Sequence, residues 1–273
     1  MTISFNQLGY TGRLGNQLWQ VASSYGIART LNQDLLLPSD WMYRPYYSVP
    51  DKYFGDIRDD TVESYDTDLV SHIDPRARVY LQDYNLWKDY ESDIHDFFTP
   101  SDMAFETVYP EIDKITRLPH PTLSVHIRRG DNVDNPRGYH PLRPLSYYKD
   151  AIDLCKKKYG IKSIGVFSDD PEYCKNNIDA DFYYEGVTRP KEHEDDFLTA
   201  PVLDWIDLEL MCHFDNHIIG NSTFAWWGAF LSLDMSPIYP SPWFGSKLQY
   251  INAGLMFPPS WEEFKIPMGD WYH

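Results

Sequence analysis

The chain has 273 residues, of which 42% are hydrophobic and 16% aromatic, so it can build a sizeable core and is not a disordered sequence. Its 24 basic and 41 acidic residues leave a formal charge of −17, which argues against broad binding to nucleic acid or anionic membranes. The 3 cysteines are widely spaced and form neither a disulfide framework nor a zinc motif, and we see no signal peptide or transmembrane run, so we expect a cytoplasmic protein.

The first half of the chain shows a weak alternation of strands and helices. We expect strands at residues 3–8, 34–38 and 77–81, and helices at residues 18–31, 86–98 and 103–115. A loop rich in glycine, residues 9–17, joins the first strand to the first helix. Such a loop lets a ligand or another backbone approach closely, although the loop taken alone favours a plain strand–helix turn. Pro119-His120-Pro121 breaks the pattern and predicts two domains, residues 1–118 and 119–273.

The second half is more regular. We expect strands at residues 122–127, 163–167, 182–185 and 217–219, and helices at residues 146–159, 198–214 and 225–233. Beyond residue 233 the chain is rich in Pro and Trp, and we predict no regular elements there. Strands that alternate with helices imply parallel sheets, so the expected fold class is α/β.

The strand at residues 122–127 ends in Arg128, Arg129, Gly130 and Asp131. In open α/β sheets ligands bind at the carboxyl ends of strands, and neighbouring residues of a strand point to opposite faces. One arginine can therefore pair with Asp131 while the other presents its planar fork to a phosphate. A structural Arg–Asp pair at the strand end is the alternative. The densest group of arginines in the chain comprises Arg128, Arg129, Arg137 and Arg143.

Two further strand ends carry polar residues. Pro171 suits the first turn of a helix and Asp170 its N-cap, which leaves Asp169 able to accept hydrogen bonds from a base edge. Ser222 and Thr223 follow the strand at residues 217–219 and precede a helix, an arrangement that suits an anion, although helix capping alone explains both residues. Arginines, a carboxylate and a helix N-terminus together suit one nucleoside diphosphate.

Four blocks of residues, in order between positions 12 and 233, resemble the motifs of glycosyltransferase family 11, the α-1,2-fucosyltransferases. Residues 12–20 (GRLGNQLWQ) resemble the N-terminal signature, and residues 125–131 (VHIRRGD) match the HxRRxD motif that several fucosyltransferase families share. Residues 167–174 (FSDDPEYC) resemble the FSDD block, and residues 217–229 (HIIGNSTFAWWGA) the NSTF block. Arg13 stands where the family usually has Gly, and Asn132 where it often has an aromatic residue. Because both positions are expected near the acceptor, these departures leave the acceptor and the linkage open.

The resemblance implies a GT-B fold, in which two Rossmann-like domains face a cleft, and inverting transfer of L-fucose from GDP-β-L-fucose. The expected acceptor is a galactose-containing oligosaccharide or glycoconjugate, fucosylated at galactose O2, with no metal ion or other cofactor and no nucleic-acid partner. The alternatives are another linkage (α-1,3 or α-1,6), a protein acceptor, or a non-catalytic glycan- or nucleotide-binding protein on the same scaffold. Together with the absence of an apolar anchor, the resemblance favours an enzyme of bacterial or viral type.

The resemblance also assigns roles to residues. Arg129 is expected to hold the β-phosphate and to neutralise charge on the leaving group. The expected donor-binding residues are Gly12, Asn16, Gln17, His126, Arg128, Arg129, Asp169, Asn221, Ser222, Thr223 and Phe224. Asp131 and Asp170 are expected to support them, and Asp134 and His140 are both candidates for the general base.

Two segments, Asp66-Thr67-Asp68 and Asp179-Ala180-Asp181, have the spacing of a DxD metal motif. Neither follows a clear apolar strand, so we predict no metal site at either.

Overall fold

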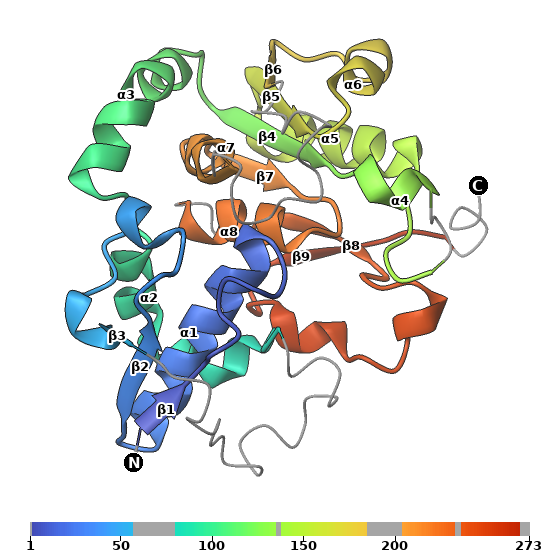
Figure 1. The fold of residues 1–273 in the computed structure, drawn as a ribbon. Helices are drawn as coiled ribbons and strands as arrows, with labels where there is room; N and C mark the ends of the chain where they lie inside the picture. Colours follow the sequence, from blue (N-terminus) through green and yellow to red (C-terminus); the bar gives the residue numbers. More distant parts are fainter. Residues whose placement is uncertain (1, 57–79, 135–137, 185–203, 233–235, 268–273) are drawn as a thin grey trace. The chain divides into compact units, whose positions relative to one another are not determined.

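A computed structural model of the chain describes residues 2–56, 80–134, 138–184, 204–232 and 236–267 (Figure 1). The chain divides into two compact units, which are Met1–Thr107 with Ile251–Pro258, and Val108–Tyr250 with Pro259–His273. The division falls inside helix α3 (Asp102–Thr116), upstream of the boundary that the sequence predicts at residues 118 and 119. It also assigns a late segment, Ile251–Pro258, to the first unit.

The first unit contains a parallel sheet of three strands in the order β1-β2-β3. The strands are β1 (Thr2–Ser4), β2 (Asp34–Pro38) and β3 (Phe54–Gly55), and the helices are α1 (Leu14–Thr30) and α2 (Glu91–Phe97). Short 3-10 helices lie at Arg44–Tyr46, Asp51–Tyr53, Tyr84–Leu86, Lys88–Tyr90 and Ala253–Met256. β2 matches its prediction, whereas β1 ends four residues early and α2 begins five residues late. The predicted strand at residues 77–81 lies mostly outside the described residues, and Leu81 is in a turn.

Helix α1 is buried along most of its length because an aromatic core surrounds it. The rings of Trp19 and Trp87 lie 5.5 Å apart, and those of Tyr25 and Phe97 lie 4.7 Å apart. A Cβ atom at Gly26 would collide with the backbone oxygen of Leu86, so only glycine permits this approach of the helix to its neighbour.

The second unit contains a six-stranded sheet in the order β6-β5-β4-β7-β8-β9, and every pair of neighbours is parallel. The strands are β4 (Thr122–Ile127), β5 (Ser163–Ser168), β6 (Phe182–Tyr184), β7 (Asn216–Ile218), β8 (Ile238–Ser241) and β9 (Glu262–Lys265). Numbered from β4, this is the order 3-2-1-4-5-6 of the Rossmann fold. The order reverses between β4 and β7, and in such sheets ligands bind at the carboxyl ends of the strands at this switch point.

The last two strands correct the prediction that no regular elements follow residue 233. β8 has the sequence IYPS, and a proline argues against a strand when the sequence is taken alone. β9 has the sequence EEFK, which carries little apolar signal. Their pairing with the rest of the sheet, and not their own composition, therefore makes them strands.

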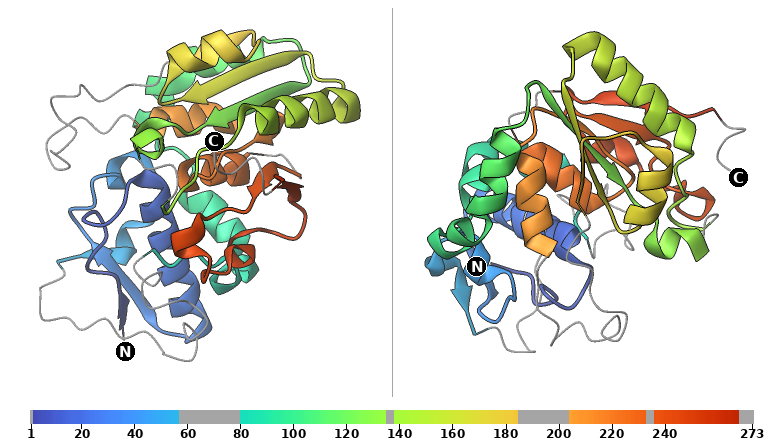
Figure 2. Two further views of the ribbon diagram at one scale, coloured as in Figure 1. Left: turned by 90° about the vertical axis from the view of Figure 1, so that its right-hand side faces the viewer. Right: turned by 90° about the horizontal axis from the view of Figure 1, so that it is seen from above.

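Helices cover both faces of this sheet (Figure 2). Helix α5 (Leu145–Tyr159) packs on the face that presents Leu123, Val125 and Ile127. Helices α7 (Asp204–Cys212) and α8 (Thr223–Leu231) lie on the other face. Gly165 of β5 belongs to this face, and the ring of Phe214 packs so close to it that an added Cβ would lie 2.5 Å from the ring. The short helices α4 (Gly130–Asp134) and α6 (Pro171–Asn177) follow β4 and β5. The parallel sheets confirm the α/β class.

Candidate functional site

The three polar strand ends that the sequence singles out lie together at the switch point of the second unit. β4 pairs with β5 on one side and with β7 on the other. At the carboxyl ends of the strands, the backbone N–H of Gly220 donates to the oxygen of His126 at 3.0 Å, and the Ser168 hydroxyl donates to the oxygen of Ile127 at 2.7 Å. The segments that begin at Arg128, Asp169 and Gly220 are therefore neighbours.

The two arginines pair with the two aspartates that follow β5. Arg128 Nη1 lies 2.6 Å from Asp169 Oδ2, and Arg129 Nε lies 2.8 Å from Asp170 Oδ2. The backbone N–H of Arg129 donates to Asp169 Oδ1 at 2.7 Å. The sequence offers Asp131 as a partner for one arginine, but the side chain of Asp131 lies outside the described residues. The register Ile127↔Ser168 brings the four side chains together.

Arg129 is held from two sides. Asp170 accepts from its Nε, and the ring of Tyr173 lies against the guanidinium, with Arg129 Cζ 3.4 Å from the ring centroid. Among the described residues, no hydrogen bond occupies the two terminal nitrogens of Arg129. A planar guanidinium with both terminal nitrogens available matches the geometry of a phosphate oxygen pair. The structure thus adds Tyr173, which the sequence did not predict as a site residue.

Asp170 supports Arg129 and helix α6 at once. Its Oδ1 accepts from the backbone N–H of Tyr173 at 3.1 Å, which makes it the N-cap that the sequence predicts. Partial burial raises the pKa of Asp170, but the hydrogen bonds from Arg129 and Tyr173 and the charge of Arg129 outweigh it and hold the pKa below its usual value. Asp170 is therefore ionised at neutral pH and keeps its pairing with Arg129.

Gly130 leaves space for the Asp169 carboxylate. A Cβ at position 130 would lie 2.5 Å from Asp169 Oδ2, the oxygen that pairs with Arg128. Glycine lets the carboxylate lie against the turn between β4 and α4, and this explains the third residue of the Arg-Arg-Gly sequence.

The turn between β7 and α8 leaves the Oδ1 of Asn221 and the hydroxyl of Ser222 without a hydrogen bond among the described residues. Ser222 is at the N-cap position of α8 but makes no capping hydrogen bond, so capping does not account for its hydroxyl. Asn221 is buried and donates to the oxygen of Pro141 at 3.1 Å, while its Oδ1 has no partner among the described residues. Thr223 begins the helix, and the ring of Phe224 lies 5.8 Å from that of His126.

His126 is a neutral, buried imidazole beside the arginine pair. Burial is the main cause that lowers its pKa, the charge of Asp169 opposes this shift, and the charge of Arg128 adds to it, so that the pKa is about 4. Its Nδ1 is buried and has no hydrogen-bond partner among the described residues. The side chain thus brings a polar atom, but no charge, to the site.

Two buried residues near this turn were not predicted as site residues. Arg143 is 7% exposed and donates to the oxygen of Trp243 at 3.0 Å, and no carboxylate pairs with it in the described part of the chain. Burial lowers its pKa to about 10, so the guanidinium stays charged. The hydroxyl of Tyr148, buried without a partner in this region, lies 3.1 Å from the place of a Cβ on Gly220. In the sequence, Arg143 stands out only as a member of the arginine group.

The candidates in the first unit hold one another in place. Gln17 is 2% exposed; its Nε2 donates to the oxygen of Gly12 at 2.9 Å, and its Oε1 accepts from Trp41 Nε1 at 2.9 Å. Gln82 Nε2 donates to Asn16 Oδ1 at 2.9 Å. Gly12 has φ +78°, a conformation that favours glycine. These hydrogen bonds stabilise the glycine loop before α1. Direct contact of Gly12, Asn16 or Gln17 with the donor stays a prediction.

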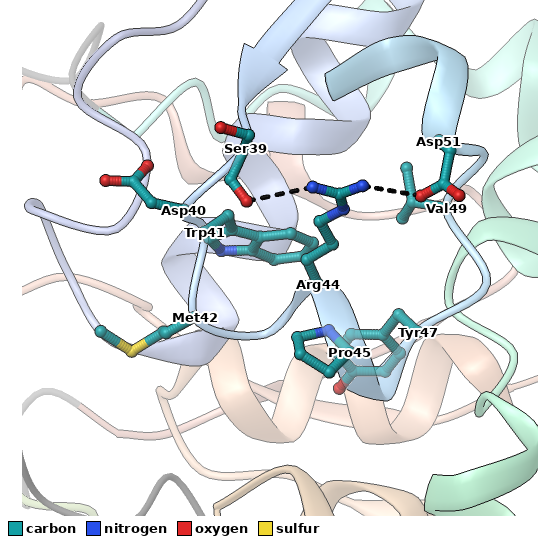
Figure 3. Close-up of a pocket in the computed structure, with 9 residues that line it drawn as sticks. All are labelled: Ser39, Asp40, Trp41, Met42, Arg44, Pro45, Tyr47, Val49 and Asp51. Carbon is teal, nitrogen blue, oxygen red and sulfur yellow. Dashed lines mark hydrogen bonds and ion pairs between the residues drawn. The ribbon is translucent and has the colours of Figure 1, made fainter. Parts of the chain in front are cut away.

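The first unit also contains a cavity of about 520 Å³ directly after β2 (Figure 3). The residues that line it are Ser39, Asp40, Trp41, Met42, Arg44, Pro45, Tyr47, Val49 and Asp51. Arg44 spans it, with Nη1 donating to the oxygen of Ser39 at 3.1 Å and Nη2 lying 2.8 Å from Asp51 Oδ1.

The two candidates for the general base remain open. His140 is exposed, and its ring lies 5.9 Å from that of Phe244. The side chain of Asp134 lies outside the described residues.

In the described part of the chain, no three His, Cys, Asp or Glu side chains come together to hold a metal ion. Asp181 accepts from the backbone N–H of Ile164 at 2.8 Å, which is a structural role, and Asp66 to Asp68 fall outside that part. No helix among the described residues is both long enough and apolar enough to cross a membrane.

Known proteins resemble this chain in sequence. The model of glycosyl transferase family 11 matches residues 27–242. An alpha-1,2-colitosyltransferase of Escherichia coli is 30% identical over 186 residues, which are 67% of this chain and 60% of the relative. The O-antigen biosynthesis glycosyltransferase WbnK of Escherichia coli is 38% identical over 145 residues, 51% of this chain and 43% of the relative. The chain thus spans about half the length of the curated relatives it matches.

Solved structures resemble it in fold. The fucosyltransferase NodZ from Bradyrhizobium aligns with a TM-score of 0.51 at 13% identity, over 85% of this chain and 91% of that one. A point mutant of Arabidopsis thaliana FUT1 in complex with GDP aligns with a TM-score of 0.51 at 12% identity, over 89% and 72%. This likeness confirms the predicted fold class, GT-B. Because the family model covers most of its length, the chain belongs to glycosyl transferase family 11.

Proposed function

We propose that this protein transfers L-fucose, with inversion, from GDP-β-L-fucose to a hydroxyl of a glycan, most simply O2 of a galactose residue. Membership of glycosyl transferase family 11 supports sugar transfer. The relative named as an alpha-1,2-colitosyltransferase supports a 1,2 linkage, and it makes GDP-colitose a donor to test beside GDP-fucose.

The observation that carries the proposal is the state of Arg129. Its Nε is paired, its face is stacked on Tyr173, and its terminal nitrogens have no hydrogen bond within the described residues. When the bond between the sugar and the β-phosphate breaks, negative charge grows on GDP. A fixed guanidinium that meets this charge stabilises the transition state more than the ground state. A guanidinium in this role supplies the charge that a metal ion supplies in other transferases, so the proposal requires no metal.

The other strand ends suit the rest of the donor. The first backbone N–H groups of α8, with the hydroxyls of Ser222 and Thr223, can bind phosphate oxygens. His126 and Asp169 are proposed to lie near the nucleoside. Either Asp134 or His140 then takes the proton of the acceptor hydroxyl.

The first test is transfer itself. The protein is incubated with GDP-fucose, EDTA and a panel of galactosides, and the products are read by mass and linkage analysis. Fucose on the galactose 2-hydroxyl supports donor, metal independence and linkage together. Fucose on another hydroxyl keeps the donor and overturns the linkage. GDP binding without transfer to any acceptor favours the non-catalytic alternative.

The Arg129→Ala variant tests the mechanism. We expect kcat to fall by roughly 10²–10³-fold, the usual loss when one fixed donor to a developing charge is removed. Its melting temperature should stay close to that of the wild type, because the pair that is lost with Asp170 is partly exposed to solvent.

A matched control is Arg117→Ala, which removes an arginine that is 76% exposed and paired with Asp113 on helix α3. This variant should keep wild-type turnover. Wild-type turnover in Arg129→Ala as well would refute the proposed mechanism.

A further inference from the structure

The cavity of the first unit lies where an α/β sheet offers a binding site. All of its lining residues belong to one segment, positions 39 to 51, that begins at the carboxyl end of β2. Crevices at the carboxyl ends of parallel strands are the usual ligand sites of such sheets. Its volume of about 520 Å³ is within the range of small-molecule sites.

The cavity combines an apolar wall with a polar rim. Met42 and Pro45 are its accessible apolar side chains. Trp41, Tyr47 and Val49, which are 2%, 5% and 6% exposed, form its packed base, where Trp41 is stacked against Tyr47 and Phe54. Asp40 is exposed at the rim, and the Asp51 side chain is 89% exposed (Figure 3). A sugar ring has the same two properties, since it presents apolar C–H groups on its faces and hydroxyls around its edge.

The charges of the cavity select against an anionic ligand. Arg44 is committed to Ser39 and Asp51, and its guanidinium also lies 4.6 Å from the centroid of the Phe54 ring. Asp40 makes no hydrogen bond or ion pair within the described residues, so its carboxylate is left to accept from a ligand. The balance of two carboxylates and one guanidinium is negative, which repels a diphosphate and admits a neutral polyhydroxyl molecule.

The wall of the cavity is tied to the matched N-terminal block. Trp41 donates to Gln17, and Gln17 donates in turn to Gly12. Both polar ends of a buried glutamine are thus used to fix Trp41 and the glycine loop in one arrangement. These two hydrogen bonds hold the Trp41 side of the cavity in a fixed position.

We propose that the cavity at residues 39–51 binds a neutral saccharide unit of the acceptor glycan, with the Asp40 carboxylate accepting hydrogen bonds from its hydroxyls. The proposal rests on the proposed function, because it identifies the cavity's ligand as part of the acceptor. Gln17 then acts as a positioning residue for the wall.

Two variants test the site, with lactose as the probe. Asp40→Asn removes the charged acceptor, and Met42→Trp fills the cavity from its lining. We expect each to raise KM for lactose about tenfold or more, since a hydrogen bond to a charged group has that effect, with kcat and KM for GDP-fucose much less affected. The matched control is Asp34→Asn, an exposed aspartate at the opposite end of β2.

Binding is also measured without the donor, by saturation-transfer NMR from protein to lactose. A signal in the wild type and in Asp34→Asn that is lost in Asp40→Asn supports the site. Equal signals in the three proteins, no signal in the wild type, or unchanged KM for lactose in both correctly folded variants overturns it. If GDP-fucose is not used with any acceptor, the proposed function fails, and the NMR comparison still decides on the cavity.

Discussion

At the scale of single residues, the support of Arg129 sets the site. The residue is restrained by one ion pair and one aromatic face, and these come from Asp170 and Tyr173, which lie in the same turn of α6. The Tyr173 backbone N–H binds Asp170 while its ring binds Arg129, so a shift of this turn would alter both restraints together. Preorganisation of a charged group before the reaction is a main source of catalytic stabilisation.

Replacement of Tyr173 measures the value of the stacked ring. We expect Tyr173→Leu to lower kcat by roughly 5- to 30-fold, the equivalent of about 1–2 kcal/mol for a partly buried cation–π contact. Tyr173→Phe and Tyr173→Trp should keep most of the activity, because each retains an aromatic face. Steady-state kinetics with GDP-fucose measure the three variants. Equal damage in Phe and Leu variants would assign the effect to the hydroxyl and contradict the stacking role.

At the scale of elements, register and turns assemble the site. The parallel register of β4 and β5 continues past Ile127 and Ser168, so that Arg128 and Asp169 leave the two strands side by side. The turn into α4 is tight enough that the Asp169 carboxylate fills the space beside Gly130.

Gly130→Ala tests this close approach. The added methyl group would contact Asp169 Oδ2, and the far end of that side chain can move aside. We therefore expect a small change in melting temperature but a clear loss of GDP affinity, because the pairing of Asp169 with Arg128 and the Arg129 backbone is disturbed. Calorimetric titration with GDP measures it. Wild-type affinity in a folded Gly130→Ala protein would show that this pairing does not affect the donor site.

At the scale of the whole molecule, the second unit buries neutral histidines. Burial lowers the pKa of His126 to about 4 and that of His217 to about 3, both far below the ordinary value near 6.5. Between the lowered pKa values and 6.5, the unfolded chain therefore binds more protons than the folded chain. Stability is complete above pH 6.5 and is lost as the pH falls toward 4.

Acid unfolding should follow from these two side chains. We expect the urea midpoint to fall between pH 6.5 and 4.5, by an amount equivalent to several kcal/mol for the two histidines together, since each pKa unit corresponds to about 1.4 kcal/mol. Asp170 and Asp215 have lowered pKa values, so their contribution to stability is lost only below the pH range in which the histidines act. The pKa of the exposed His120 is raised by its hydrogen bond with Asp215, so this residue stabilises the folded chain at acid pH, by a small amount.

Ring signals in NMR provide the direct check. Those of His126 and His217 should stay at neutral positions down to pH 5, while His120 titrates above its ordinary value. Titration of His126 near 6.5 would contradict its burial as a neutral residue.

The sequence by itself determined the local pattern. The strand at Thr122–Ile127, the helix at Leu145–Tyr159 and the Asp170 cap at the start of α6 follow from periodicity and turn chemistry, which neighbouring residues decide. The order of four matched blocks also sufficed to predict the family, because those blocks are short and contiguous.

Only the tertiary structure decided the partners. Arg129 contacts Asp170, which is 41 residues away in the sequence, and Asp169 accepts from the Arg129 backbone, 40 residues away. No local sequence pattern predicts contacts between residues so far apart. The strands β8 and β9 exist because they pair with the rest of the sheet. The cavity after β2 and the use of Gln17 to hold Trp41 depend likewise on long-range packing. Local propensity sets the elements, but contacts between distant residues set the site.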